Sequence, residues 1–221
     1  MPDNPATAQE MKETVKTEIK NPRAGLRALK TNPFILFWGT IPFTAEYRLC
    51  YEFVNSQSQA SELIFSYLGR SPFLSLLEQD SLWQKNNLHF VVSGFRFQAE
   101  QKFYIHSLSV EVLSQDEYAP FGFYIAPHLS YATARFSSKY LNLYDIYIAV
   151  SQFNINLKMG AQFRIMNRFT VDCFGGIGYK NNVWAQHYSN INIKRISLED
   201  IPKVYSGHVK ILLGLNAGFT F

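Results

Sequence analysis

The chain has 221 residues, of which 47% are hydrophobic, 16% aromatic and only 17% charged, and its formal net charge is +4. The charged share lies below the ~25% of an ordinary soluble domain, and the hydrophobic share excludes a disordered chain. No apolar run approaches the ~18 residues of a membrane helix. Lys and Arg form no basic patch interleaved with aromatic residues, so we expect no nucleic-acid partner.

Residues 1–30 are polar and charged, with weak helical character over 8–19, and are predicted to form an N-terminal arm or short surface helix. The arm either contacts a protein partner or is a solvated tail. It contains no apolar core long enough for a signal peptide. An exported chain would therefore need a signal that has been removed or lies upstream.

From residue 32 onward, apolar residues alternate with polar or small ones, which is the period of a β-strand. The extended stretch 32–53 is about twice the ~9–11 residues that cross a bilayer as a strand, so we divide it near Gly39. Eight strands are predicted, at about 34–38, 40–53, 61–69, 88–105, 120–136, 148–165, 169–179 and 208–221.

The connections between these strands alternate in length. Tight turns are expected at 55–59 and 166–168, and longer loops at 70–87, 137–145 and 180–206, while 106–118 is longer than the scheme prefers. The fold class is therefore all-β: an eight-stranded antiparallel up-and-down transmembrane β-barrel at 31–221, preceded by the arm at 1–30. Cys50 and Cys173 fall on opposite faces of the pattern, so we expect no disulfide between them.

Alternation alone does not say which face of a barrel is inside, and a lipocalin-like soluble barrel is the competing interpretation. Its apolar face, rich in Phe, would overfill an eight-stranded interior. The polar face carries many glycines, which suit a narrow polar lumen better than a solvated surface. Tyrosine and tryptophan near the strand ends are typical of interfacial girdles: Trp38, Tyr51, Tyr104, Tyr147, Tyr179 and Tyr205.

Three segments resemble small outer-membrane β-barrel proteins of Bacteroidota: NPFILFWGTIPFTAEYR at 32–48, APFGFYIAPHLSY at 119–131 and NRFTVDCFGGIGY at 167–179. The resemblance covers about 32–221 and includes no catalytic motif. It implies the barrel fold and a location in the bacterial outer membrane, in a family whose function is largely unknown. It also implies that the barrel-insertion machinery reads the terminal aromatic residues, Phe219 and Phe221.

The face assigned to the lumen carries charges of both signs, which must pair in a narrow interior or cost several kcal/mol each. We predict a salt-bridge network that fills the lumen; a gated conduction path is the alternative. The residues are Glu46, Arg48, Glu52, Arg96, Glu100, Lys102, Lys158, Arg164, Asp172 and Lys210.

No catalytic, cofactor or metal site is predicted. His128, Ser130, Asp172 and His208 are all assigned inward, but no nucleophile elbow or metal-ligand spacing supports them. We therefore expect no enzyme activity, although outer-membrane barrel enzymes exist.

Loop aromatics beside cations are reasonable recognition groups, and here they are Trp83, Trp184, His187, Lys194 and Arg195. Loops that fold over the barrel mouth are the competing interpretation of these residues. Two function classes follow. The first is a structural or assembly component that lies in the lipid bilayer and contacts a periplasmic or membrane protein. The second is a surface ligand-binding or adhesive protein that acts through its extracellular loops.

Overall fold

The computed structural model describes residues 25–37, 39, 41, 44–72, 90–105, 119–138, 147–165, 168–188, 192–195 and 207–221. The predicted fold class is confirmed: eight antiparallel strands close into an up-and-down barrel. In these ranges, no helix is both long enough and apolar enough to span a membrane. The arm over residues 1–24 lies outside the described residues, and its predicted helix stays a prediction.

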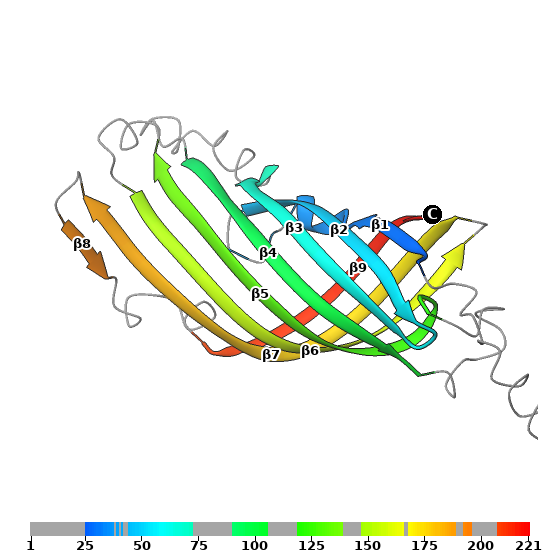
Figure 1. The fold of residues 1–221 in the computed structure, drawn as a ribbon. Coiled ribbons are helices and arrows are strands. Elements are labelled where there is room, and N and C mark those ends of the chain that lie inside the picture. Colours follow the sequence, from blue (N-terminus) through cyan, green and yellow to red (C-terminus); the bar gives the residue numbers. More distant parts are fainter. Residues whose placement is uncertain are drawn as a thin grey trace, which may run out of the picture.

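The barrel strands follow chain order around the wall, and β9 closes the ring by pairing with both β7 and β1 (Figure 1). A ninth strand, β8, pairs only with the end of β7 and stands outside the ring. The strands are β1 (Arg27–Thr31), β2 (Thr44–Ser56), β3 (Gln59–Arg70), β4 (Phe90–Tyr104), β5 (Gly122–Ser138), β6 (Tyr147–Ile165), β7 (Phe169–Tyr188), β8 (Asn192–Arg195) and β9 (Val209–Thr220).

The start of the barrel differs from the prediction. The first strand is β1, which lies mostly inside the segment assigned to the arm, so the barrel begins at Arg27 rather than at residue 31. The strand predicted at 34–38 is wrong, because Phe34–Leu36 forms a 3-10 turn, η1. Five residues of alternation are too few to stand out in a polar sequence, whereas the apolar residues of η1 resemble those of a strand.

The loop predicted at 180–206 is also corrected. β7 continues to Tyr188, paired with β6 as far as Tyr147↔His187, and then turns into the short β8 hairpin. Trp184 and His187 therefore lie on a strand. Beyond Tyr179 both faces of β7 are largely polar, so the alternation that marks the lower part of the strand disappears.

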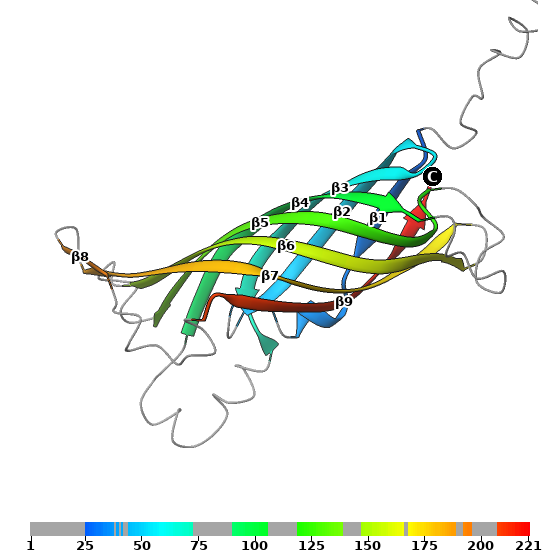
Figure 2. The same cartoon turned by 90° about the horizontal axis from the view of Figure 1, so that it is seen from below.

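The barrel wall has unequal height around its circumference. Both chain ends of the barrel meet at one end, where Arg27 and Phe221 exchange backbone hydrogen bonds of 3.0 and 2.8 Å. We call this the near end; the β2–β3 turn and the β6–β7 turn also lie there. At the opposite, far end, β6 and β7 extend well beyond β9 (Figures 1 and 2). The wall is therefore tall at β6 and β7 and low at β1 and β9.

The two faces of the wall have opposite character. Large apolar side chains point outward and are exposed along the strands, among them Leu49, Phe65, Phe97, Leu157 and Ile177. The inward face carries charged, amide and small side chains. The expectation for Cys50 and Cys173 agrees with the structure, in which Cys50 is buried, Cys173 is exposed and both are free.

Close packing in the lumen depends on glycine at two positions. A Cβ on Gly160 would lie 2.6 Å from the Tyr124 ring, and one on Gly214 would overlap the Phe174 ring. The aromatic side chains occupy the space that these glycines leave. Tyr104, predicted to be in an outer girdle, is instead buried in the lumen, because it lies on the same face of β4 as Lys102.

Candidate functional site

All carboxylate side chains in the described part of the chain lie inside the barrel: Glu46, Glu52, Glu62, Glu100 and Asp172. The strand register places three of them side by side, with Glu52 opposite Glu62 on β3 and Glu62 opposite Glu100 on β4. Like charges on directly opposite positions destabilise a sheet. The row is therefore stable only because cations lie across the lumen from it.

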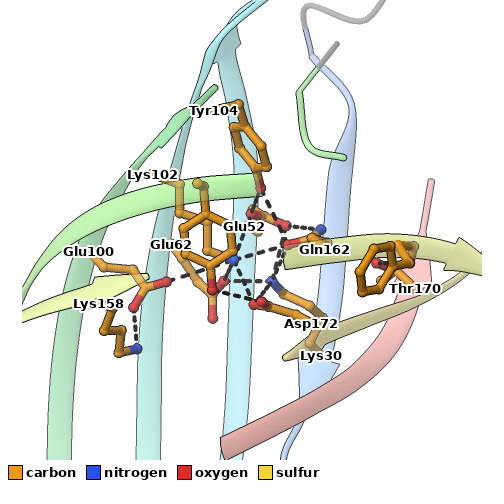
Figure 3. A network of polar contacts seen from close by, with 12 residues as sticks. Lys30, Glu52, Glu62, Glu100, Lys102, Tyr104, Lys158, Gln162, Thr170 and Asp172 are labelled. Atoms are coloured by element: carbon orange, nitrogen blue, oxygen red, sulfur yellow. Dashed lines mark hydrogen bonds and ion pairs between the residues drawn. The ribbon is translucent and has the colours of Figure 1, made fainter. Parts of the chain in front are cut away.

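Two lysines neutralise this acidic row (Figure 3). The Nζ of Lys30 lies 3.1 Å from Glu52, 2.6 Å from Glu62 and 3.4 Å from Asp172. The Nζ of Lys102 lies 3.1, 2.8 and 2.8 Å from the same three carboxylates and 3.7 Å from Glu100. We call these two lysines with Glu52, Glu62 and Asp172 the acidic cluster. It joins β1, β2, β3, β4 and β7 across the lumen.

Neutral side chains satisfy further groups of the acidic cluster. Gln162 accepts hydrogen bonds from Lys30 at 3.2 Å and from Lys102 at 3.0 Å, and its amide nitrogen donates to Glu52 at 2.8 Å. The Tyr124 hydroxyl donates to Asp172 at 2.7 Å. Buried ions need such additional bonds, because attraction between the ions alone does not offset their desolvation. β5 and β6 are tied into the network in this way.

The lumen towards the far end is predominantly cationic. Arg48 Nη2 lies 2.9 Å from Glu46, and the Arg96 guanidinium pairs with the other oxygen of the same carboxylate. Arg96 also donates to Gln152 at 3.2 Å. Lys210 on β9 is buried nearby, and within the described residues it forms no ion pair or hydrogen bond. We call Arg48, Arg96 and Lys210 with Glu46 the basic cluster.

A cavity of about 310 Å³ lies beside the basic cluster. Its walls include Arg48, Arg96, Gln98 and Lys210, together with Lys158, whose ammonium pairs with Glu100 and lies 4.4 Å from the centroid of the Phe174 ring. The ion pair of Lys158 and Glu100 stands between the two clusters. The lumen thus has three parts in sequence: the acidic cluster, this pair, and the basic cluster with the cavity.

The predicted lumen residues fall into these groups, with one exception. The structure places Glu52, Lys102 and Asp172 in the acidic cluster, and Glu46, Arg48, Arg96 and Lys210 in the basic cluster, with Glu100 and Lys158 between them. Arg164 is not among them. It lies exposed at the near-end rim, and its guanidinium carbon is 5.2 Å from the ring centroid of the buried Phe121.

The inward prediction for Arg164 follows from the alternation of β6, which this residue continues. However, the residue after it, Ile165, is the last of the strand, and there the wall no longer encloses the side chain. A long guanidinium at a rim reaches solvent while its stem covers an apolar neighbour. Alternation predicts whether a side chain points inward or outward, but it does not predict where along a strand the barrel wall ends.

Sequence reasoning missed four members of the acidic cluster network: Lys30, Glu62, Tyr124 and Gln162. Lys30 is not predicted as a lumen residue because its five-residue strand lies mostly in the segment assigned to the arm. Glu62 and Gln162 lie on the polar faces of correctly predicted strands, so the alternation of β3 and β6 is a signal that could have found them.

The considered catalytic groups form no hydrogen bond with one another among the described residues. His128 is buried and bonded on both ring nitrogens, to Gln98 at 3.0 Å and to Asn156 at 2.8 Å. Ser130 is buried on the same strand, whereas His208 is exposed and stacks on Tyr179 with ring centroids 5.3 Å apart. The inward assignment of His208 is therefore wrong. Among the residues described, no group of His, Cys, Asp and Glu could hold a metal ion.

The candidate recognition residues lie at the far end, where the structure describes them. His187 stacks on Tyr147 with ring centroids 4.4 Å apart, and Trp184 is half-buried on β7, its indole nitrogen without a hydrogen bond to any described residue. Lys194 and Arg195 form part of β8, opposite Gln186 and Ala185. Trp83 lies outside the described residues. At the near end, Phe219 and Phe221 are exposed.

Comparison with known proteins identifies no family. No family model matches the chain, and no curated protein matches it. Among solved structures, the chain is similar to the crystal structure of a major outer membrane protein from Thermus thermophilus, with 10% identity, a TM-score of 0.46, and coverage of 90% of this chain and 100% of that one. A similarity this low adds nothing to the fold derived from the strand pairing. The location of the protein has to be argued from its own surface.

Proposed function

We propose that the protein is an integral β-barrel of the bacterial outer membrane. The observation that carries this proposal is the reversal of inside and outside: ion pairs occupy the interior, and large apolar side chains cover the exterior. Leu213 is 84% exposed, Ile211 76% and Met159 63%, while Arg96 is 1% exposed. In water such an exterior would aggregate, whereas in lipid it is the favourable surface.

Strand lengths support the same conclusion. A tilted strand needs about 9–11 residues to cross the hydrocarbon, and β9 has 12 while β6 has 19. Closure of the ring leaves no free edge at the level where all eight strands pair, as a bilayer requires. The extra length of β6 and β7 then projects on the far side, which we assign to the cell exterior.

We further propose that the lumen is filled and that the protein is a structural or assembly component rather than an enzyme. The acidic cluster spans the lumen through hydrogen bonds from opposite walls, and an apolar cluster that includes Val54, Tyr104 and Tyr124 lies between it and the near end. Phe219 and Phe221 would be read by the barrel-insertion machinery, and the arm at 1–30 would contact a periplasmic or membrane protein.

A surface ligand-binding or adhesive role is the second candidate. The extension of β7 and the β8 hairpin favour it, because they raise Trp184 and His187 above the low part of the wall. Cross-linking from the arm, compared with cross-linking from the 189–206 connection, separates the two roles. The resemblance to Bacteroidota barrels is compatible with both and stays a prediction.

Refolding into lipid vesicles tests the membrane proposal. The urea-unfolded chain should insert, become protected from added protease, and migrate faster on unheated than on heated electrophoresis gels. A chain that stays fully digestible in the presence of vesicles, or that folds to a monodisperse monomer in buffer without detergent, would contradict the proposal.

A further inference from the structure

The barrel wall contains a lateral seam on the low side. β9 pairs with β7 from Val209 onward, but its other edge pairs with β1 only over the last residues, from Thr31↔Ala217 to Ala28↔Thr220. On the opposite side of the seam, β2 pairs with β1 only from Cys50 onward. Within the described residues, the upper half of β9 therefore has no strand neighbour on that side, and η1 lies in the seam's place.

The cavity described above reaches this seam. It is lined by inward-facing Lys210 and by outward-facing Ile211 and Leu213. Both faces of β9 thus contact one cavity, which is possible only where that edge of the strand is not covered by a neighbour. Asn32 and Ile35, from the segment after β1, line the cavity as well. The cavity connects the basic cluster with the apolar exterior.

Several hydrogen-bond donors that line the cavity have no acceptor among the described residues. Lys210 is only 8% exposed and, in the part of the chain described, lies in no salt bridge. The Nε of Arg48 and the amide nitrogen of Gln98 are buried without a hydrogen bond. Gln98 is itself almost wholly buried, with a relative exposure of 5%. Unsatisfied buried donors are costly, and all of these would be satisfied by the oxygens of one anion.

The numbers of cations and carboxylates in the two clusters also favour an anionic ligand. The acidic cluster sets Lys30 and Lys102 against three carboxylates, while the basic cluster sets Arg48, Arg96 and Lys210 against Glu46. All carboxylates of the described residues are already used in these contacts or in the pair with Lys158. Among the described residues, no carboxylate is therefore left to pair with Lys210.

We propose that the seam between β2 and β9 binds an anionic amphiphile from the surrounding leaflet, with its phosphate headgroup in the basic cluster and its acyl chain on the outer face of β9. The inference rests on the proposed membrane location. Phosphate oxygens accept several charge-assisted hydrogen bonds at once. A cavity of about 310 Å³ is at the small end of the ~300–1,000 Å³ range of ligand sites, so it holds a headgroup and leaves the chain outside.

The geometry of β9 suits such a molecule. Lys210 lies next to the first residue of the strand, at the level where the low wall ends, while Ile211 and Leu213 follow towards the middle of the membrane. A headgroup at the level of Lys210 therefore places its acyl chain along these two exposed side chains. A peptide strand that paired with the free edge would use the backbone of β9 but would leave the donors of the basic cluster unsatisfied.

The test is native mass spectrometry of the full chain in micelles that contain equal amounts of phosphatidylglycerol and phosphatidylcholine. We expect one phosphatidylglycerol to be retained selectively. Lys210→Met should weaken retention roughly tenfold or more, as expected for loss of a charge-assisted hydrogen bond, and Lys210→Arg should restore most of it. Arg168→Met, which removes an exposed cation from the near-end turn, is the matched control and should retain lipid as the wild type does.

The acyl chain and the source of the phosphate are tested separately. Leu213→Gln should weaken retention, while Leu157→Gln, on the outer face of β6, should not. Millimolar inorganic phosphate should not displace the lipid. Equal retention of both lipids, no effect of Lys210→Met, displacement by inorganic phosphate alone, or a dimer sealed along β9 that retains no lipid would each overturn the proposal.

The same preparations are checked for insertion into vesicles by protease protection. A chain that inserts but shows no lipid preference contradicts only the seam proposal. A chain that does not insert contradicts the proposed membrane function, and the seam proposal with it.

Discussion

Lys102 shows at the scale of one residue how the lumen is held together. Its ammonium lies within 4 Å of four carboxylates on four different strands, Glu52, Glu62, Glu100 and Asp172. Because the register of the sheet sets three of these carboxylates side by side, removal of the cation leaves repelling charges in a buried site.

Lys102→Met should therefore lower the free energy of unfolding by about 3–5 kcal/mol, the usual cost of breaking a buried ion pair. Urea titration in lipid vesicles measures this. The control is Arg27→Met, which removes an exposed cation and should change stability by less than about 0.5 kcal/mol. Equal stability of Lys102→Met and the wild type would show that the cluster does not hold the barrel.

Gly160 offers a second test at this scale, through packing rather than charge. A Cβ there would lie 2.6 Å from the Tyr124 ring and 2.7 Å from a backbone oxygen of β7. Gly160→Ala should cost about 1–3 kcal/mol of stability, because neither neighbour can withdraw without breaking other contacts. Gly175→Ala, whose new Cβ would meet only the end of Leu213 at 3.4 Å and a backbone oxygen at 3.8 Å, should be nearly neutral. Similar losses at both positions would contradict the close packing of the lumen.

At the scale of an element, β1 is the piece on which closure depends. Among the described residues, its five residues are the only link in the ring between β2 and β9, and they also carry Lys30 into the acidic cluster. A chain without β1 keeps seven strands, leaves two open edges and loses one of the two lysines. Two edges that are open along their whole length would leave all of their backbone groups unpaired in hydrocarbon, which is strongly unfavourable.

Two truncations test the role of β1. Deletion of residues 1–24 leaves every described contact in place and should preserve the heat-sensitive electrophoretic mobility of the folded barrel. Deletion of residues 1–31 should abolish it. A folded, protease-resistant barrel after the longer deletion would show that the ring closes without β1.

A strand can be predicted from the sequence when one of its faces is apolar and the other is polar. The bounds predicted for β6 are almost correct to the residue, because outward apolar residues alternate with inward polar or small residues from Gln152 to Ile165. β1 is missed because its five residues show too little contrast between two faces. The part of β7 beyond Tyr179 is missed because polar residues and the apolar run Val183–Ala185 interrupt the alternation there. The segment of η1 is mistaken for a strand because its three residues are all large and apolar.

The clusters in the lumen can be predicted less well than the strands. Alternation indicates which side chains point inward, and so it assigns Lys102 and Asp172 correctly to the interior. It does not indicate which of them meet, because contacts across the lumen depend on the register and on the height of each wall. Arg164 shows the effect of wall height, because it is predicted inside and is exposed at the rim. Tyr104 is predicted in a girdle because it lies near a strand end, but it continues the inward face of β4 and is buried.

At the scale of the whole molecule, we propose that the lumen is filled, because an apolar cluster, the acidic cluster and the basic cluster follow one another along it. Opening an aqueous path through such a lumen would break the ion pairs of Lys30, at 2.6 to 3.4 Å, and would leave several buried charges unpaired. In planar bilayers, the wild-type chain should therefore show no steady single-channel current. Stable ohmic currents would contradict a filled lumen without contradicting membrane insertion.

The central claim, that the apolar outer face meets lipid, is tested most directly by spin labels on that face. Labels are introduced by Leu129→Cys and Leu157→Cys, with Cys50 and Cys173 replaced by serine, and the protein is refolded into vesicles. Both positions should be accessible to dissolved oxygen and protected from a water-soluble nickel complex, since oxygen partitions into hydrocarbon and the complex does not. High accessibility to the nickel complex at both positions would place this face in water and would contradict the account.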